Sequence, residues 1–191
     1  NTPLLFKTTD QGKTWQRITD GIPDTQFTWV IRADPERAGL LYAGTELGVY
    51  VSLNDGDSWQ PLQGKLPVAA VRDMKIRGNE LAVATHGRSF WILDDLTVIR
   101  QAANSVMDSA VHLFKPANAY RSAYQMAAGR STGPGKKYML RLGASVAWEE
   151  TKDENEEIQT TILDGGHNPP FGVTLHYYIK DGQAKDAALT V

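Results

Sequence analysis

Short segments in which apolar and polar residues alternate, separated by Gly, Pro, Asp or Asn, fill the first half of the chain. They are rich in aromatic and β-branched residues, and with a period of two this composition is typical of β-strands. Strands are predicted at 27–33, 40–45, 48–53, 58–62, 71–77, 81–85 and 89–93. The first four make a complete four-stranded unit and the others begin a second, while residues 3–18 hold the last two strands of a preceding unit.

These units are copies of one another. Residues 5–15 match residues 49–59 at an offset of 44, with aromatic, Ser/Thr, Asp/Asn, Gly and Trp residues at corresponding positions. A second offset, of 40, relates residues 41–45 to 81–85 and carries Tyr50 onto Phe90. A period of roughly 40–45 residues with four short strands is typical of the blades of a β-propeller.

The pattern changes beyond residue 96. Residues 97–137 are rich in Ala, Ser, Asn and Gly and are interpreted as a connector. Within it, residues 100–107 fit a short helix or a loop, 111–114 a strand stopped by Pro116, and 129–137 a mobile Gly-rich loop.

Alternation with period two returns between Tyr138 and Trp148 and predicts a strand there. Six acids and one Lys in residues 149–157 predict a solvated turn or loop, with a Ca²⁺ site as the minor alternative. Further strands are expected at 158–163, at 173–179 and from 188, with breaks at Asn168-Pro169-Pro170 and Asp181-Gly182.

The expected fold is therefore all-β. Residues 1–96 would be the C-terminal blades of an incomplete propeller, 97–137 the connector, and 138–191 a partial β-sandwich. About two and a half blades leave long sheet edges unpaired. We expect the remaining blades of the same protein, or another chain, to complete the propeller, and the 191 residues to be a fragment.

Composition narrows the classes of function. The chain carries 20 Lys and Arg against 22 Asp and Glu, and this balance argues against nucleic-acid binding. No apolar run approaches the roughly 18 residues of a transmembrane helix. The absence of Cys excludes disulfides, thiolate zinc sites and Cys nucleophiles. His86 has no second ligand at metal spacing, and no phosphate-loop motif occurs, so neither a metal nor a cofactor is expected.

A repeated motif resembles a known family. Thr8-x-Asp10-x-Gly12-x-Thr14-Trp15 is similar to the Asp-box, or BNR, repeat of sialidases, sortilin-type propellers and two-propeller xyloglucanases. A second copy carries Asn in place of Asp. The residues expected to form the two turns are Thr8, Asp10, Gly12 and Trp15, and Ser52, Asn54, Gly56 and Trp59. We expect the carboxylate to accept backbone N–H bonds, Gly to adopt positive φ, and Trp to plug the space between sheets. These roles are structural.

A third copy, Val71 to Asp95, resembles the last blade of large exported bacterial proteins described as sortilin-like or glycosyl-hydrolase-like. In that family a fibronectin-type or immunoglobulin-like domain follows the propeller, and residues 168–173 and 176–180 resemble its opening. The resemblance implies an exported bacterial protein, placed in the periplasm, on the cell surface or outside the cell. Fold alone does not establish its activity.

The turns between second and third strands suggest a ligand site. They place Glu46, His86 and Arg88 at one end of neighbouring blades, flanked by Gln26 and Lys65 of the blade connections. One interpretation is binding of an anionic or sugar ligand, with Glu46 as a possible acid or base. The other is that His86 and Arg88 only hold the last blade through hydrogen bonds or an ion pair.

Two main functions remain open: a glycan- or peptide-binding module, or part of a glycoside hydrolase whose catalytic residues lie mostly in upstream blades. A third option is a protein-assembly scaffold similar to the propellers of photosystem assembly factors, which also carry Asp boxes. Glycosidases need two carboxylates roughly 5 to 10 Å apart across a cleft. Asp94 and Asp95 are adjacent on a predicted strand and point to opposite faces, so they cannot both contact one substrate.

Overall fold

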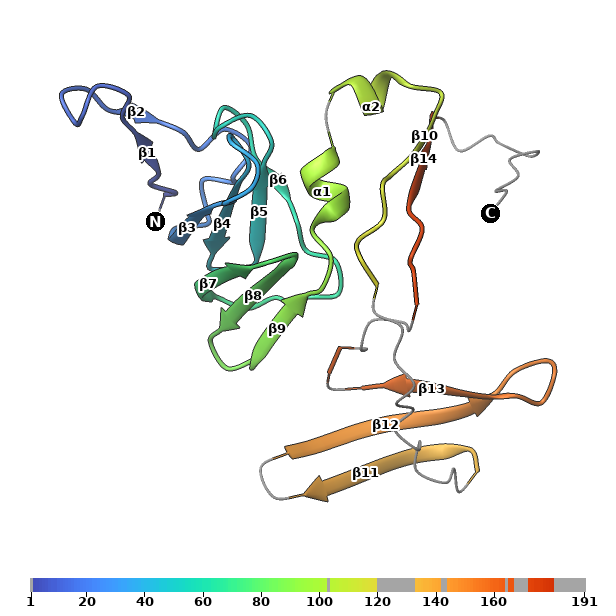
Figure 1. Ribbon diagram of the computed structural model, residues 1–191. Coiled ribbons are helices and arrows are strands. Elements are labelled where there is room, and N and C mark those ends of the chain that lie inside the picture. Colours follow the sequence, from blue (N-terminus) through green and yellow to red (C-terminus); the bar gives the residue numbers. More distant parts are fainter. Residues whose placement is uncertain are drawn as a thin grey trace. The chain divides into compact units, whose positions relative to one another are not determined.

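The computed structural model describes residues 2–102, 104–119, 133–141, 144–163, 165–166 and 172–180. Within these ranges the fold is all-β, as expected, with antiparallel sheets that are each open (Figure 1). The chain divides into two compact units. The first unit comprises Asn1–Asn118 and Val173–Val191, and the second comprises Ala119–Gly172.

Three sheets of the first unit follow one another along the chain, a hairpin and then two up-and-down meanders. The first pairs β1 (Phe6–Lys7) with β2 (Gln16–Arg17). The middle sheet is β3 (Thr28–Ala33), β4 (Leu41–Thr45), β5 (Val49–Ser52) and β6 (Gln60–Pro61). The last sheet is β7 (Val71–Arg77), β8 (Glu80–Thr85) and β9 (Phe90–Leu93). The seven strands predicted between residues 27 and 93 are thus confirmed, with ends shifted by at most two residues.

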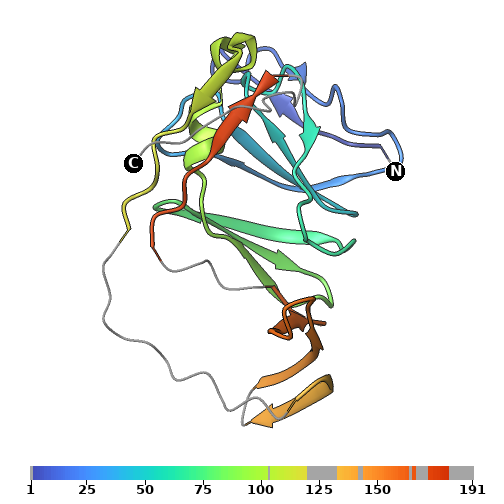
Figure 2. The ribbon, with the colours of Figure 1, turned by 90° about the vertical axis from the view of Figure 1, so that its right-hand side faces the viewer.

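The central strands β4 and β5 of the middle sheet are buried at almost every position, so both faces of the sheet are covered there. Successive residues of a strand point to opposite faces. One face packs against the last sheet, and Figure 2 shows these two sheets as adjacent layers. This cluster includes Tyr42, Val49 and Val51 of the middle sheet together with Val71, Met74, Leu81 and Val83 of the last. The opposite face packs against the first hairpin, in a cluster formed by Leu5, Ile18, Ile22, Ala43, Tyr50 and Trp59.

The strand register corrects one correspondence between the sheets. The offset of 40 carries Tyr50 onto Phe90, but the pairs Ala43–Tyr50 and Val83–Trp91 occupy the same place in the two sheets. The turn after β8 is one residue longer than the turn after β4, so Tyr50 corresponds to Trp91.

Two short helices follow the last sheet, α1 (Thr97–Gln101) and α2 (Asn104–Asp108). Arg100 of α1 reaches two sheets at once. Its Nε lies 3.0 Å from Oδ2 of Asp34 after β3, and its Nη1 and Nη2 donate to Asn79 and Gly78 between β7 and β8. The helix is thereby attached to the turns at one end of both sheets. No feature of the sequence predicted this contact.

The first unit also contains a two-stranded ladder, β10 (Val111–Leu113) with β14 (Tyr177–Ile179). The strand expected at 111–114 is confirmed. The strand expected at 173–179 is shorter than predicted, because residues 173–176 lie outside the ladder. The backbone N–H of Phe114 still donates to His176, and this bond extends the contact by one residue.

The second unit is a three-stranded sheet of β11 (Gly135–Arg141), β12 (Ala144–Lys152) and β13 (Ile158–Ile162). The single strand predicted from Tyr138 to Trp148 is wrong, because these residues belong to two antiparallel strands in which Tyr138 faces Ala147. Period two cannot distinguish one long strand from a tight hairpin whose two arms continue the alternation.

The acidic stretch at 149–157 is only partly a turn. Residues 149–152 extend β12, and Glu150 is buried at 6% exposure, where it forms an ion pair with Lys137 and accepts the indole N–H of Trp148. Lys137 itself lies in β11 rather than in the predicted Gly-rich loop. The expectations for residues 129–132, 168–170, 181–182 and 188–191 lie outside the described residues.

Candidate functional site

The hairpin between β1 and β2 is held by side-chain bonds to its own backbone. Oδ1 of Asp10 accepts the N–H of Thr14 at 2.8 Å, and Oδ2 accepts the Thr14 hydroxyl at 2.7 Å. The Thr8 hydroxyl donates to Asp10 and accepts the N–H of Gly12 at 2.8 Å. These bonds, chiefly those from Thr14, lower the pKa of Asp10 to about 2. Gly12 has a φ of 87°, as its predicted role requires.

The hairpin between β5 and β6 repeats the same pattern. Oδ1 of Asn54 accepts the Ser58 N–H at 3.0 Å, and the Ser52 hydroxyl accepts the Gly56 N–H at 2.9 Å. Here the Asn54 amide donates to the Ser58 hydroxyl, whereas in the first hairpin the threonine hydroxyl donates to the carboxylate. Asn therefore replaces Asp without loss of a bond because the hydroxyl both donates and accepts.

The two tryptophans of these hairpins differ in burial. Trp59 is 4% exposed and donates its indole N–H to the carbonyl of Ile18, which lies in the strand connection before the middle sheet. Trp15 is 61% exposed and donates to Gly12 within its own turn. Trp59 thus packs between the middle sheet and the first hairpin, whereas no sheet among the described residues covers Trp15 on the outer side of the first hairpin.

The turns predicted to bear a ligand site have equivalent backbones. Glu46 donates its N–H to the carbonyl of Phe27, and His86 donates its N–H to the carbonyl of Ala70. The last residue of each connection into the sheet thus lies beside the equivalent turn. Gln26 has a structural role, because its Oε1 accepts the hydroxyl of the buried Thr45 at 2.9 Å.

The other predicted ligand residues make no bond to Glu46 among the described residues. His86, Arg88 and Lys65 are exposed. Within the part of the chain that the structure describes, no hydrogen bond or ion pair joins Glu46 to His86 or to Arg88. The Arg88 carbonyl accepts the indole N–H of Trp91 at 2.7 Å, so the backbone of this turn stabilises the last sheet.

Glu46 instead belongs to a cluster with Phe27, Trp29 and Arg72, which we call the Trp29 cluster. Both β3 and β7 have a register shift near their first residue, and Trp29 and Arg72 are the residues that these shifts leave unpaired. A β-bulge redirects a side chain at the end of a strand. The two equivalent bulges lie in neighbouring sheets and bring the guanidinium carbon of Arg72 to 3.7 Å from the centroid of the Trp29 ring.

Each member of the Trp29 cluster orients the indole. The Trp29 N–H donates to Oε2 of Glu46 at 2.6 Å, and the Phe27 ring meets Trp29 edge to face with centroids 4.8 Å apart. Trp29 nevertheless remains 43% exposed. A hollow of about 500 Å³, lined by Thr2, Leu4, Phe27 and Thr28, borders the cluster at Phe27.

Sequence reasoning missed Trp29 and Arg72. Their side chains meet only because each occupies a bulge at the same level of adjacent sheets. The signal that could have found them is positional, since both are the second residue of the first strand in their sheet.

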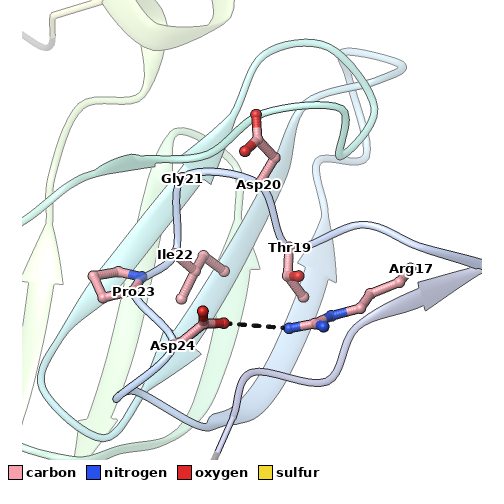
Figure 3. Close-up of a pocket in the computed structure, with 7 residues that line it drawn as sticks. All are labelled: Arg17, Thr19, Asp20, Gly21, Ile22, Pro23 and Asp24. Carbon is pink, nitrogen blue, oxygen red and sulfur yellow. Dashed lines mark ion pairs between the residues drawn. The ribbon is translucent and has the colours of Figure 1, made fainter.

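A second hollow, of about 610 Å³, lies along the connection between β2 and β3 (Figure 3). All of its lining residues come from the single segment 17–24, and it contains an ion pair between Arg17 and Asp24 with 3.5 Å between the charged atoms. Both side chains are exposed, so the pair is well solvated and weak. This hollow lacks converging groups from other elements.

Asp94 and Asp95 have separate environments. Burial, and then the charge of Glu80, raise the pKa of Asp94. Asp95 accepts the backbone N–H of Thr97 at 2.8 Å at the start of α1, and its other oxygen lies 3.7 Å from Nε2 of His176. Both acids lie beyond the end of β9 at Leu93, so the expectation that they alternate along a strand is wrong, and Asp95 instead bonds to the first residue of α1.

The described residues form neither a metal site nor a membrane-spanning helix. No group of three or more His, Cys, Asp or Glu side chains is arranged to hold a metal ion. No helix in the described ranges combines the length and apolar character needed to cross a membrane.

Comparisons with known proteins are sparse. No protein-family model matches the chain, and no curated protein matches its sequence. Among solved structures, the crystal structure of an ancestral GH74 enzyme is similar, with 15% identity and a TM-score of 0.38 over 83% of this chain. The chain spans about 15% of the length of that enzyme.

Proposed function

We propose that this chain is the C-terminal part of an exported Asp-box propeller protein that binds a glycan or a peptide. The observation that carries the binding role is the Trp29 cluster: an exposed indole held between a guanidinium and a carboxylate. The matching bond patterns of the two hairpins support the Asp-box assignment.

The chemistry of the cluster favours a polar ligand with an apolar surface. Arg72 stacks on Trp29, and among the described residues its N–H donors have no hydrogen-bond acceptor. They therefore remain available for a ligand carboxylate, hydroxyl or carbonyl. Glu46 uses one oxygen for the indole and keeps the other as an acceptor. Sugars and peptides both combine an apolar patch with such donors and acceptors.

The same geometry favours binding over hydrolysis. Glycoside hydrolysis needs a second carboxylate across the substrate. Asp73, the acid next to Arg72 in the chain, is engaged elsewhere: its Oδ1 lies 2.5 Å from Arg32 and accepts the backbone N–H of Met74. Glu46 is the carboxylate that the described residues place in the Trp29 cluster.

A panel of neutral and acidic oligosaccharides and peptides, immobilised and probed with the chain, tests the proposal. For each ligand bound, we expect Trp29→Ala and Arg72→Ala to weaken affinity at least about tenfold. Tyr138→Ala, a change of an exposed aromatic residue in the second unit, is the matched control and should bind normally.

Three outcomes would contradict parts of this proposal. Unchanged affinity in both Trp29→Ala and Arg72→Ala would reject the site. Absence of binding to the whole panel would reject the binding function. Release of reducing sugar from a polysaccharide by the chain itself would favour the glycoside hydrolase alternative.

A further inference from the structure

Arg72 is a cation whose position is fixed and whose charge is not neutralised. It is exposed near the start of β7, and its guanidinium carbon lies 3.7 Å from the centroid of the Trp29 ring. Stacking on an aromatic ring uses the face of a guanidinium and leaves its edge, which carries the N–H donors, open to a ligand. Among the described residues Arg72 forms no hydrogen bond and no ion pair, so all of these donors are available.

The carboxylates beside Arg72, one in the cluster and one in the sequence, have other partners. Glu46 accepts the indole N–H of Trp29 at 2.6 Å, so it lies beyond the edge of the ring, whereas Arg72 lies over the ring face. No ion pair joins Glu46 to Arg72 within the described part of the chain. Asp73 instead forms an ion pair with Arg32. The indole therefore holds a positive and a negative charge at separate places, each open to a ligand.

The turn after β8 adds positive charge at the same end of the last sheet. The N–H of His86 in this turn donates to the carbonyl of Ala70, so the turn lies beside the start of β7 and hence beside Arg72. Arg88 follows in the turn and is exposed. Glu46 supplies one negative charge against the two positive charges of Arg72 and Arg88. The local field therefore favours a ligand that carries a negative charge.

The open groups of the cluster match a sugar acid. The edge of a guanidinium and a carboxylate are both planar, and they form two parallel hydrogen bonds. The second oxygen of Glu46 can accept a hydroxyl, and the indole of Trp29, which is 43% exposed, offers an apolar surface to a ring. An acidic saccharide carries a carboxylate, hydroxyl groups and an apolar ring face on one residue, whereas a peptide must supply them from several side chains.

We propose that the Trp29 cluster binds an acidic saccharide, with the sugar carboxylate on Arg72 and a sugar hydroxyl on Glu46. This inference rests on the binding function proposed above and names the class of its ligand. A neutral sugar would contact the same indole but would lack the paired bonds to the guanidinium. Trp29 is thus the contact that acidic and neutral sugars share, and Arg72 is the residue that distinguishes them.

Matched pairs of ligands test this assignment. Oligomers of galacturonate, glucuronate and mannuronate are compared by calorimetry with their carboxyl-reduced forms, in which a primary alcohol replaces each carboxylate. Wild-type chain should prefer at least one acidic form over its reduced form by about tenfold to hundredfold, the range of a charge-assisted contact. Arg72→Gln should bind both forms within about threefold of each other. The wild-type preference should also fall as salt is added, because the site is exposed.

Arg77→Gln is the matched control, because Arg77 is exposed at the opposite end of the same strand and its replacement removes the same charge. It should keep the wild-type preference. Arg72→Lys retains the charge without the planar fork and should keep only part of the preference. Trp29→Ala should weaken the binding of acidic and reduced forms alike. Circular dichroism checks that each variant is folded.

The outcomes separate this inference from the proposed binding function. Equal wild-type affinity for acidic and reduced forms, with both weakened by Trp29→Ala, overturns the acidic ligand and leaves the binding function standing. So does tighter binding of an acidic peptide than of every acidic saccharide. A loss of preference in Arg77→Gln as large as that in Arg72→Gln would show a general effect of charge and reject Arg72 as the specific contact. Absence of binding to every saccharide and peptide overturns both.

Discussion

Replacing Arg100 with Met is expected to destabilise the first unit strongly. Arg100 is 9% exposed and contacts both oxygens of Asp34, at 3.0 and 3.1 Å, while Asp34 is fully buried. Met preserves much of the side-chain volume but removes the positive charge and all of the donors. The Asp34 carboxylate would then be buried without its cation, which is the costly half of a broken buried ion pair.

The contacts of Asp34 and Arg100 set the expected loss in the free energy of unfolding. Removing one partner of a buried pair costs about 3–5 kcal/mol. Asp34 would keep the backbone N–H bonds of Glu36 and Arg37, at 2.8 and 3.0 Å, and these favour the lower end. Bonds from Arg100 to Asn79 and Gly78 would also be lost, at roughly 1 kcal/mol each. Together these contributions give an expected loss of about 5 kcal/mol in the free energy of unfolding.

Urea unfolding followed by tryptophan fluorescence measures this loss. In a Trp148→Phe background all remaining indoles lie in the first unit, so the signal reports its unfolding. Asp34→Asn added to Arg100→Met removes the unpaired charge and should recover part of the stability. A loss below about 1 kcal/mol, or a double variant no more stable than Arg100→Met, would refute the reasoning.

Three other predictions concern the hairpins. Hydrogen bonds, chiefly from Thr14, hold the pKa of Asp10 at about 2. Ionised Asp10 should therefore stabilise the folded chain fully above the unfolded pKa of about 4, and this stabilisation should be lost as pH falls through 2. An NMR titration that gives an unshifted pKa for Asp10 contradicts this prediction. Trp59→Ala should cost about 3–5 kcal/mol in urea unfolding and Trp15→Ala less than about 1, and equal losses would refute the difference in packing. Gly21→Ala should cost more than about 1 kcal/mol, because φ is 89° and the new Cβ would lie 2.1 Å from the Trp59 carbonyl oxygen; a Gly21→Ala chain as stable as wild type would show that this backbone relaxes.

Much of the first unit was predictable because its signals are local. Alternation of apolar and polar residues defined the strands, and the spacing of Asp10 and Thr14 suffices for a carboxylate to cap its own turn. Locality also explains the errors. Apolar and polar residues alternate from Tyr138 to Trp148 whether this segment forms one strand or two. Only the pairing of strands in the folded chain distinguishes the two cases.

The candidate site was less predictable because it depends on how sheets align. Glu46 was expected at a ligand site from its turn, yet its side chain bonds to Trp29, on whose ring Arg72 stacks, rather than to His86 or Arg88. Two bulges in different sheets must lie at the same level before the indole and the guanidinium can stack. The spacing of residues along the sequence does not show whether the two bulges are aligned across the sheets.

Trp15 and Trp59 show which features follow from the sequence alone and which depend on the tertiary structure. The sequence by itself determined the turn around Trp15 and the turn around Trp59, since both use bonds between residues within four positions of each other. Only the tertiary structure decided that one indole is buried and the other exposed. Burial is a property of the neighbouring surface: Trp59 meets the chain segment at Ile18, whereas the described residues offer Trp15 no such neighbour.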